Sequence, residues 1–289
     1  MIKIKTNKAK AAFDYYKTEL LDFYNEKESL SILKILFQET CNISRTEMIV
    51  NPDLRLNESD ILKIHFAIKE IKKYKPIQYI IGNTNFCGLD FFVDENVLIP
   101  RPETEELVDL IVNENKNRDK IKILDVGTGS GCIAISLKNE LKNPEVYAID
   151  KITEALKVAE GNAINHNLKI NFLEIDILNK NEIKNLHKFD VIVSNPPYIR
   201  KSEKKLMRKN VLDFEPESAL FVNDNDPLIF YKAISEFAKS HLRNNGKLYF
   251  EINEAFGDEV KKMLLDFSFN KVVLKSDLSG KHRMVSAEA

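Results

Sequence analysis

The residues with the clearest chemical potential are Asn195-Pro196-Pro197-Tyr198, which follow the apolar run 189–194. A β-branched run that ends in Asn and two prolines indicates a buried strand that stops abruptly. Neither proline can donate to a sheet, and each fixes its φ angle at about −65°. Ligands of open α/β sheets bind at the carboxyl ends of the strands. The loop would therefore offer an amide side chain, free carbonyl groups and an aromatic ring to a planar amide or amine nitrogen.

A second chemical motif is the glycine-rich turn Gly127-Thr128-Gly129-Ser130-Gly131, between a predicted strand at 121–126 and a helix predicted from Cys132. Strand, glycine turn and helix start form an arrangement in which the backbone approaches a ligand closely. The third glycine comes one residue earlier than in the dinucleotide fingerprint, and Asp125 lies two residues before the first. The Asp125 carboxylate would repel a pyrophosphate and attract the ammonium of an amino-acid moiety, such as that of S-adenosylmethionine.

Two further acids lie at predicted strand ends. Asp150 closes the strand predicted at 145–150, where a carboxylate can accept both hydroxyl groups of a ribose. Because Asp125 and Asp150 bracket the glycine turn, cofactor binding is favoured over a simple tight turn. Asp176 and Ile177 follow the strand predicted at 170–175. Asp176 would accept from the exocyclic amine of an adenine and Ile177 would pack on its ring, with a solvated turn acid as the alternative for Asp176.

A stiff segment precedes the glycine turn. Two prolines flank Arg101 and hold it in extended backbone, and a helix is predicted to begin at Thr104 or Glu105. The segment is either punctuation before a helix or the wall of a pocket. We favour a pocket wall that includes Arg101, Glu103 and Thr104.

The rest of the chain predicts the elements that position these motifs. Strands and helices alternate from about residue 120, which indicates a mostly parallel, doubly wound α/β sheet. Strands near Val272 and Met284 are predicted to close it as an antiparallel pair, giving the methyltransferase variant of the Rossmann architecture. Segments 78–82 and 89–93 predict a β-hairpin. We therefore expect a helical domain at 1–75, a hairpin linker at 76–100 and a catalytic domain at 101–289.

Several helix starts can also be predicted. A capping-box spacing begins at Ser44, and Asn57 opens an amphipathic helix followed by Pro76. Asp226 and Pro227 predict the N-cap and first position of a later helix. The helical segment 1–75 is either a cap on the main domain or a partner-binding module. The basic stretch 201–209 is either a solvated helix face, which we favour, or a docking surface for an acidic or RNA-binding partner.

Composition argues against several classes of protein. The 289 residues carry a formal net charge of −1, so no global basic field indicates nucleic acid as a partner. Cys41, Cys87 and Cys132 are scattered, which suits a reducing compartment, and no CxxC or histidine-rich cluster predicts a metal site. The chain starts without an apolar signal core, and no stretch approaches about 18 uncharged apolar residues. A soluble, cytoplasmic protein is expected.

Several segments together resemble the bacterial protein-(glutamine-N5) methyltransferases that modify class-I peptide chain release factors, the PrmC/HemK family. An Asn-Pro-Pro-Tyr loop also occurs in adenine-N6 methyltransferases, whereas Arg-Pro-Glu-Thr-Glu before the glycine turn is much more specific. The segments carrying the resemblance are 76–82 (Pro-Ile-Gln-Tyr-Ile-Ile-Gly), 98–105 (Leu-Ile-Pro-Arg-Pro-Glu-Thr-Glu), 125–131, 193–198, 214–216 (Phe-Glu-Pro) and 277–280 (Asp-Leu-Ser-Gly) with Arg283.

The resemblance implies a Rossmann-like class I S-adenosylmethionine-dependent methyltransferase sheet, with a small N-terminal helical domain that recognises the release factor. The reaction would methylate N5 of the glutamine in the GGQ loop of class-I release factors and leave S-adenosylhomocysteine. The glycine turn and Asp150 would hold the cofactor, Asn195 would touch cofactor and substrate, and the whole Asn-Pro-Pro-Tyr loop would clamp the glutamine. Ile177 stands where relatives can carry a tryptophan, which this chain lacks.

An amide nitrogen is a poor nucleophile because its lone pair is delocalised into the carbonyl group. We expect the Asn195 side-chain oxygen and the Pro196 carbonyl to accept its two hydrogens, and Tyr198 to stack on the flat amide. One alternative is an adenine-N6 methyltransferase acting on DNA or RNA, which the near-neutral charge disfavours. Another is a cofactor-binding module that only docks on a release factor. The expected protein is a monomer with no stable nucleic-acid or membrane binding.

Overall fold

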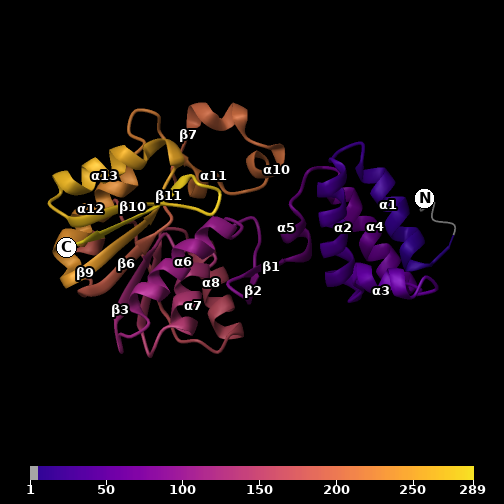
Figure 1. The fold of residues 1–289 in the computed structure, drawn as a ribbon, viewed down its shortest axis with the longest axis horizontal. Helices are drawn as coiled ribbons and strands as arrows, with labels where there is room; N and C mark the ends of the chain where they lie inside the picture. The colour runs from indigo at the N-terminus through magenta and orange to yellow at the C-terminus, as the bar shows by residue number, and fades with distance from the viewer. Residues whose placement is uncertain (1–5) are drawn as a thin grey trace. The chain divides into compact units, whose positions relative to one another are not determined.

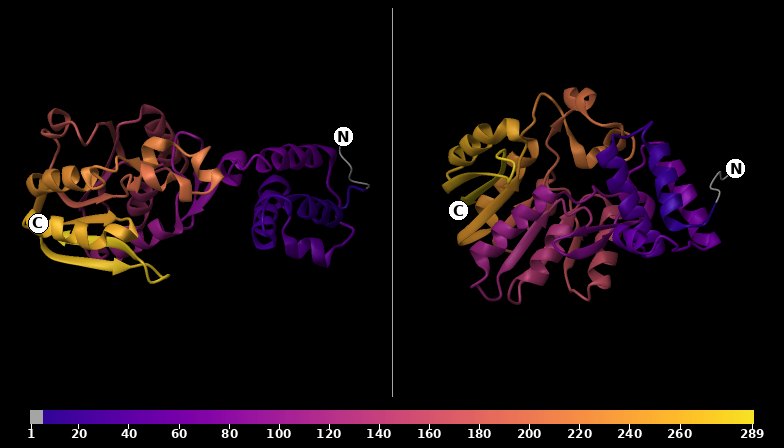
Figure 2. Two further views of the ribbon diagram at one scale, coloured as in Figure 1. Left: turned by 90° about the horizontal axis from the view of Figure 1, so that it is seen from above. Right: turned by 45° about the vertical axis from the view of Figure 1, so that its right-hand side comes forward.

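The structure, a computed structural model, describes residues 6–289 and divides them into two compact units (Figure 1). The helical unit comprises the chain up to Gly82 together with Arg208–Phe214, and the larger unit comprises Asn83–Met207 and Glu215–Ala289. The helical unit thus extends beyond residue 75, where the sequence placed its end. Figure 2 shows both units from two further directions. In the described part of the chain, no helix is both long and apolar enough to cross a membrane.

The helical unit forms where local capping signals predict it. Ser44 Oγ accepts from Glu47 N at 3.1 Å, and the Glu47 carboxylate accepts from Ser44 N at 2.7 Å, which confirms the capping box. Asn57 Oδ1 accepts from Asp60 N at 2.8 Å and caps the next helix, as predicted. The helices are α1 (Ala9–Leu20), α2 (Glu26–Cys41), α3 (Arg45–Val50), α4 (Glu58–Ile71), α5 (Ile77–Ile81) and the short α10 (Lys209–Leu212).

The first strand of the predicted hairpin is wrong, because residues 78–82 belong mainly to helix α5. That helix starts after Pro76 and ends at Gly82, which has a left-handed φ of 72°. Ile77 is buried in the apolar core of the helical unit, where Ile80 and Ile81 also pack. Burial against other helices therefore overrides the β-branched composition of this short segment.

The hairpin lies further along the chain. Strands β1 (Asn83–Phe86) and β2 (Leu89–Phe92) pair in antiparallel fashion, with Phe86 opposite Leu89. The two residues between them, Cys87 and Gly88, have φ angles of 49° and 75°, as a type I′ turn requires.

The larger unit is built on a seven-stranded sheet with the order β10-β11-β9-β6-β3-β4-β5. The strands from β9 to β5 in this order are parallel neighbours, and β11 runs antiparallel to both β9 and β10. The predicted mostly parallel sheet with an antiparallel closing pair is confirmed. The strands are β3 (Lys122–Val126), β4 (Glu145–Asp150), β5 (Asn171–Glu174), β6 (Phe189–Ser194), β9 (Leu242–Glu251), β10 (Asn270–Ser276) and β11 (His282–Glu288), with β7 (Ile199–Arg200) and β8 (Phe221–Val222) in a separate parallel ladder.

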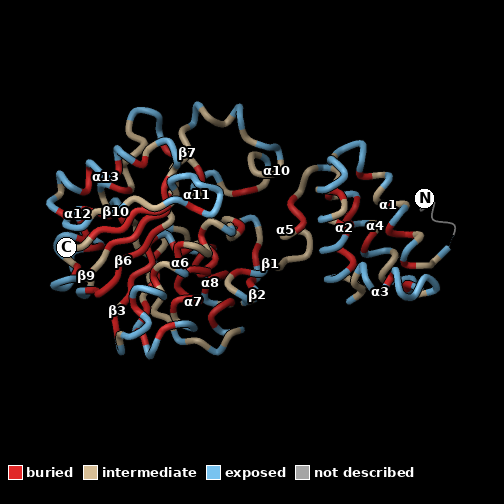
Figure 3. Tube along the Cα trace, in the orientation of Figure 1, coloured by how far each residue is buried: buried red, intermediate tan, exposed pale blue. Residues whose placement is uncertain are grey.

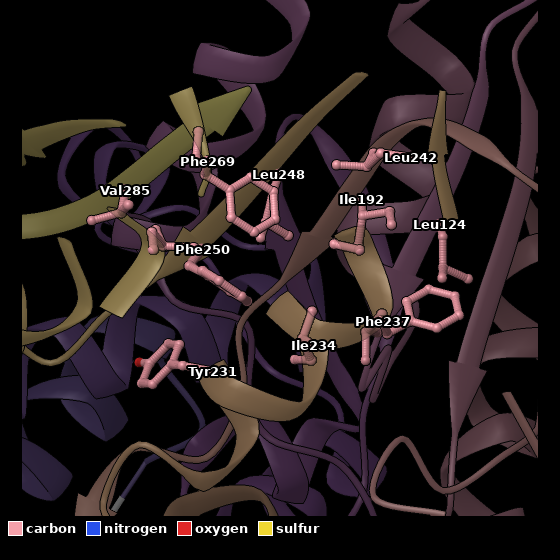
Figure 4. Close-up of a cluster of buried hydrophobic side chains, with 14 of the residues drawn as sticks. Leu124, Ile192, Tyr231, Ile234, Phe237, Leu242, Leu248, Phe250, Phe269 and Val285 are labelled. Atoms are coloured by element: carbon pink, nitrogen blue, oxygen red, sulfur yellow. The ribbon is translucent and has the colours of Figure 1, made fainter. Parts of the chain in front are cut away.

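Helices cover both faces of this sheet, because alternate strand residues point to opposite sides. On one face, Ile192 packs with residues of the helices α12 (Ile229–His241) and α13 (Gly257–Asp266), in the cluster drawn in Figure 4. On the other face, Val191 and Val193 pack with residues of α6 (Pro102–Asn115), α7 (Cys132–Glu140) and α8 (Thr153–Asn165). Figure 3 shows β6 and the strands beside it buried along most of their length. The helices are α6 (Pro102–Asn115), α7 (Cys132–Glu140), α8 (Thr153–Asn165), α9 (Lys180–Ile183), α11 (Glu217–Leu220), α12 (Ile229–His241), α13 (Gly257–Asp266) and the 3-10 helices η1 (Lys201–Leu206) and η2 (Glu254–Phe256).

Two helix starts differ from the sequence predictions. Helix α6 begins at Pro102 and not at Thr104 or Glu105, because a proline at the first helical position has a suitable φ and needs no hydrogen bond from its nitrogen. Helix α12 begins at Ile229, because Asp226 N donates to Asn223 O at 3.1 Å in a preceding turn. Asp226 therefore does not serve as the N-cap.

Candidate active site

The predicted site motifs meet at the carboxyl ends of β3, β4 and β6. Val126 of β3 lies opposite Ile149 of β4 and Ser194 of β6, so the three strands end side by side. A cavity of about 1010 Å³, including open solvent at its mouth, lies at these ends. Its lining contains most of the predicted site residues: Gly127, Thr128, Gly129, Ser130, Asp150, Asp176, Ile177, Asn195, Pro196, Pro197, Arg101 and Thr104.

The glycine turn leaves open space above its backbone. Gly127, Gly129 and Gly131 have φ angles of 72°, 53° and 81°, which favour glycine. A Cβ at Gly127 or Gly129 would meet no atom within 4 Å, whereas one at Gly131 would lie 3.0 Å from Ile135 Cδ1. The first two glycines therefore present bare backbone to the cavity. A Cβ at Gly131 would also lie 3.3 Å from Ala159 Cα, so the third glycine allows α8 to pack closely on the turn.

Asp150 supports this turn from the end of β4. Its Oδ2 accepts from Gly129 N at 2.9 Å, and its Oδ1 accepts from Ile152 N at 3.0 Å. Burial raises the pKa of the Asp150 carboxyl, and backbone donors oppose that rise. Each carboxylate oxygen still has a lone pair for a ligand hydroxyl on the cavity side.

Asp125 lies beneath the turn and is fully buried, so it does not line the cavity. Its Oδ2 accepts from Thr128 Oγ1 at 2.7 Å. Within residues 6–289 its Oδ1 is buried and has no hydrogen-bond partner, and burial raises the pKa of this carboxyl to about 7. An orphaned carboxylate oxygen under an open glycine cradle fits a ligand that brings a positive charge close to the turn.

The Asn-Pro-Pro-Tyr loop is held by a buried glutamate that the sequence analysis missed. Asn195 Nδ2 donates to Thr104 Oγ1 at 3.2 Å, and Thr104 Oγ1 donates to Glu251 Oε2 at 2.6 Å. The Tyr198 hydroxyl donates to the other oxygen of Glu251 at 3.1 Å. Glu251 is the last residue of β9, and burial raises the pKa of its carboxyl. The signal that could have found it is an acid near the carboxyl end of the strand that the sequence predicts at 247–252.

Tyr198 and Glu103 lie outside the cavity lining. The Tyr198 ring packs against the apolar cluster around β9 and α12, and its hydroxyl is directed at Glu251. Its predicted stacking on a substrate amide therefore stays a prediction.

Asp176 lines the cavity, and its Oδ1 accepts from Leu178 N at 2.9 Å. Ile177 is buried beside it, where the adenine was expected.

The wall formed by Arg101 is fixed by a second glutamate. The Arg101 guanidinium pairs with Glu215 Oε1 at 2.5 Å, and Ile99 N donates to Glu215 Oε2 at 3.4 Å. The Glu215 side chain is only 1% exposed. Glu215 comes from the Phe-Glu-Pro segment that contributed to the resemblance. Pro100 and Arg101 thus line the cavity, whereas Pro102 does not.

The basic stretch near the loop is largely solvated. Helix η1 contains no buried residue, and Lys204 pairs with Glu217 at 2.6 Å. Arg208, which belongs to the helical unit, lies 3.3 Å from Glu28. Acidic side chains thus pair with part of the positive charge of this stretch.

Comparisons with known proteins agree with this fold. The family model described as PrmC N-terminal domain matches residues 11–82, and the methyltransferase small domain model matches residues 104–214. A 16S rRNA N2 G1207 methyltransferase from Thermus thermophilus, solved with AdoMet and guanosine, has a TM-score of 0.51 at 16% identity. The match covers 71% of this chain and 49% of the Thermus protein, and it shows the methyltransferase fold alone.

Two curated relatives carry the name release factor glutamine methyltransferase. The protein from Flavobacterium psychrophilum is 46% identical over 277 residues, which cover 93% of this chain and 96% of the relative. The protein from Bacteroides thetaiotaomicron is 41% identical over 273 residues, which cover 94% and 97%. Both similarities cover more than nine-tenths of this chain. The chain therefore belongs to the release factor glutamine methyltransferase family.

Proposed function

We propose that this enzyme transfers a methyl group from S-adenosylmethionine to N5 of the glutamine in the GGQ loop of class-I release factors. The observation that carries the proposal is the orientation of Asn195 in the cavity. Its Nδ2 is engaged by Thr104, so the opposite end of the amide, Oδ1, is left for a substrate that donates hydrogens. A glutamine side chain offers two such hydrogens on one planar nitrogen.

The residues at the strand ends fit the cofactor. The bare backbone at Gly127 and Gly129 would hold its amino-acid moiety, with the Asp125 carboxylate below to favour the ammonium. Asp150 would accept the ribose hydroxyls, and Ile177 would pack on the adenine. When bound, the cofactor supplies an electrophilic methyl group on a sulfonium.

The loop would position the substrate nitrogen rather than deprotonate it. We expect Asn195 Oδ1 and the Pro196 carbonyl to accept the two amide hydrogens and so fix the direction of the nitrogen lone pair. Both hydrogen bonds strengthen as positive charge develops on that nitrogen, which stabilises the transition state more than the ground state. The new N–CH3 bond would form as the S–CH3 bond breaks, which would leave S-adenosylhomocysteine. One amide proton, acidic only as that bond forms, would be released to solvent, so no strong base is needed beforehand.

The acceptor can be tested with labelled S-adenosylmethionine and purified release factor, tRNA, rRNA or DNA. We expect label on the release factor alone, and none on a release factor whose GGQ glutamine is replaced by alanine. Label on nucleic acid would instead support the adenine-N6 alternative, and no label on any acceptor would favour a docking module.

The role of Asn195 can be tested by its replacement with alanine. Correct orientation contributes up to about 7–11 kcal/mol in well-aligned reactions, so we expect turnover to fall by at least about 100-fold. Cofactor affinity, measured by calorimetry, should change little. The exposed Asn139, replaced by alanine, is the matched control and should keep full turnover. A near wild-type rate for Asn195→Ala would contradict the mechanism.

A further inference from the structure

We propose that Thr104 and Glu251 are positioning residues that set which end of the Asn195 amide faces the substrate. This proposal rests on the proposed function, because it concerns how Asn195 presents an acceptor to the glutamine nitrogen. It assigns a role to two residues that lie 147 positions apart in the chain and are joined by a buried hydrogen bond of 2.6 Å.

The direction of each hydrogen bond follows from the chemistry of the groups. Glu251 accepts through both of its oxygens, from the Thr104 and Tyr198 hydroxyls, so the single proton of the Thr104 hydroxyl is donated to Glu251. The Thr104 oxygen can then only accept from its other neighbour. The neighbour must present an N–H group, and the 3.2 Å contact is indeed with Asn195 Nδ2. A flipped amide would place Oδ1 against a lone pair of Thr104.

The carboxylate is itself firmly held. Glu251 is 1% exposed, and both of its oxygens accept from hydroxyl groups, those of Thr104 and Tyr198. Its backbone carbonyl accepts from the Tyr231 hydroxyl at 3.1 Å. A buried carboxylate is costly unless its hydrogen bonds are complete. Glu251 lies at the end of β9, two hydrogen bonds away from Asn195. A role in orienting the Asn195 amide accounts for this placement.

Without the Thr104 hydroxyl, nothing in this chain of hydrogen bonds distinguishes the two ends of the Asn195 amide. The flipped form would direct an NH2 group at the NH2 group of the glutamine, and donor would face donor. Only part of the enzyme would then present the acceptor. The loss would fall on the chemical step and leave the cofactor cradle at the ends of β3 and β4 intact.

The first test compares Thr104→Val, which removes the hydroxyl and keeps the shape, with Thr104→Ser, which retains it. We expect Thr104→Val to lower kcat by about 10–100-fold, with cofactor affinity within about twofold of wild type. Thr104→Ser should recover most of the lost turnover. Wild-type kcat for Thr104→Val, or no recovery with Thr104→Ser, would overturn the proposal.

A double-mutant cycle separates positioning from a general structural effect. In an Asn195→Ala background, Thr104→Val should lower kcat by less than about twofold, because its target is already absent. If the two substitutions lower kcat independently, so that the loss in the double variant is the product of the two single losses, the proposal is overturned. If Thr104→Val alone fails to fold, the pair Thr104→Val with Glu251→Gln removes the acid and keeps an acceptor for the Tyr198 hydroxyl, and it should fold and show the same loss of kcat. Wild-type kcat for that pair would equally count against positioning.

Labelling of a release factor by the wild-type enzyme distinguishes a wrong positioning role from a wrong proposed function. If wild-type enzyme does not label the GGQ glutamine of a release factor, the proposed function is wrong. If it does, and Thr104→Val is fully active, only the positioning role is wrong.

Discussion

Replacing Asp125 by asparagine should stabilise the ligand-free enzyme at alkaline pH. Burial raises the pKa of the Asp125 carboxyl from 3.8 to about 7 in the folded state. Between these values the folded protein holds a proton that the unfolded chain has released. Stability therefore falls as pH rises from about 4 to about 7, because folding then requires either proton uptake or a buried charge. Above pH 7 the penalty is constant.

The size of the penalty follows from the shift. Each pKa unit corresponds to about 1.4 kcal/mol, so the rise from 3.8 to about 7 costs about 4 kcal/mol at pH 8 and about 2 kcal/mol at pH 5. Asparagine keeps an oxygen that can accept from Thr128 but places an NH2 group where Oδ1 has no partner. An unpaired buried donor costs about 1–3 kcal/mol at any pH. The variant should be near wild type in stability at pH 5 and more stable by about 1–3 kcal/mol at pH 8.

The assay is urea unfolding of wild type and Asp125→Asn at pH 5, 6, 7 and 8, without cofactor. The informative quantity is the change in the stability difference with pH, about 2–3 kcal/mol in favour of the variant between pH 5 and pH 8. The exposed Asp266, replaced by asparagine, is the control and should show no such trend. A stability difference that is the same at pH 5 and pH 8 would refute a buried carboxyl with a pKa of about 7.

Three further predictions concern the cradle and its wall. Asp150→Ala should raise the cofactor dissociation constant by about tenfold or more, through loss of a charged acceptor, and an unchanged calorimetric titration would contradict its role. Gly131→Ala should lower the free energy of unfolding by about 1–3 kcal/mol, because φ is 81° and the new methyl would crowd α7. Gly127→Ala, with open space above it, should lose less packing, and equal losses measured by urea unfolding would argue against this distinction. Glu215→Ala should lower stability by about 1–3 kcal/mol, since the Arg101 guanidinium loses its partner, and an unchanged unfolding midpoint would exclude a structural role for the pair.

Much of the site could be predicted from the sequence because its signals are local. Strand ends marked by Asp150 and by the Asn-Pro-Pro-Tyr loop are recognised from an apolar run that stops at a polar residue. Parallel strands bring such ends to one edge of the sheet, so the residues line one cavity. The caps at Ser44 and Asn57 were predictable for the same reason, since each needs only a side chain and a backbone group three residues later.

Other features depended on contacts that no local pattern encodes. Residues 78–81 are β-branched and aromatic and predict a strand, but α5 forms because its apolar side chains meet the core of the helical unit. Asp125 was expected to face a ligand from its place before the glycine turn, yet only the packed sheet determines that it lies beneath the turn.

Local sequence patterns are enough to predict the chemistry proposed for this enzyme: a glycine cradle between two acids, and a stiff loop that offers an amide acceptor. The orientation of that amide depends on contacts made in the folded chain. Asn195 meets Thr104 across 91 positions of the chain, and Thr104 meets Glu251 across 147. Hydrogen bonds between such distant residues exist only after the sheet has assembled, because the end of β9 and the start of α6 must first be brought together beside β6.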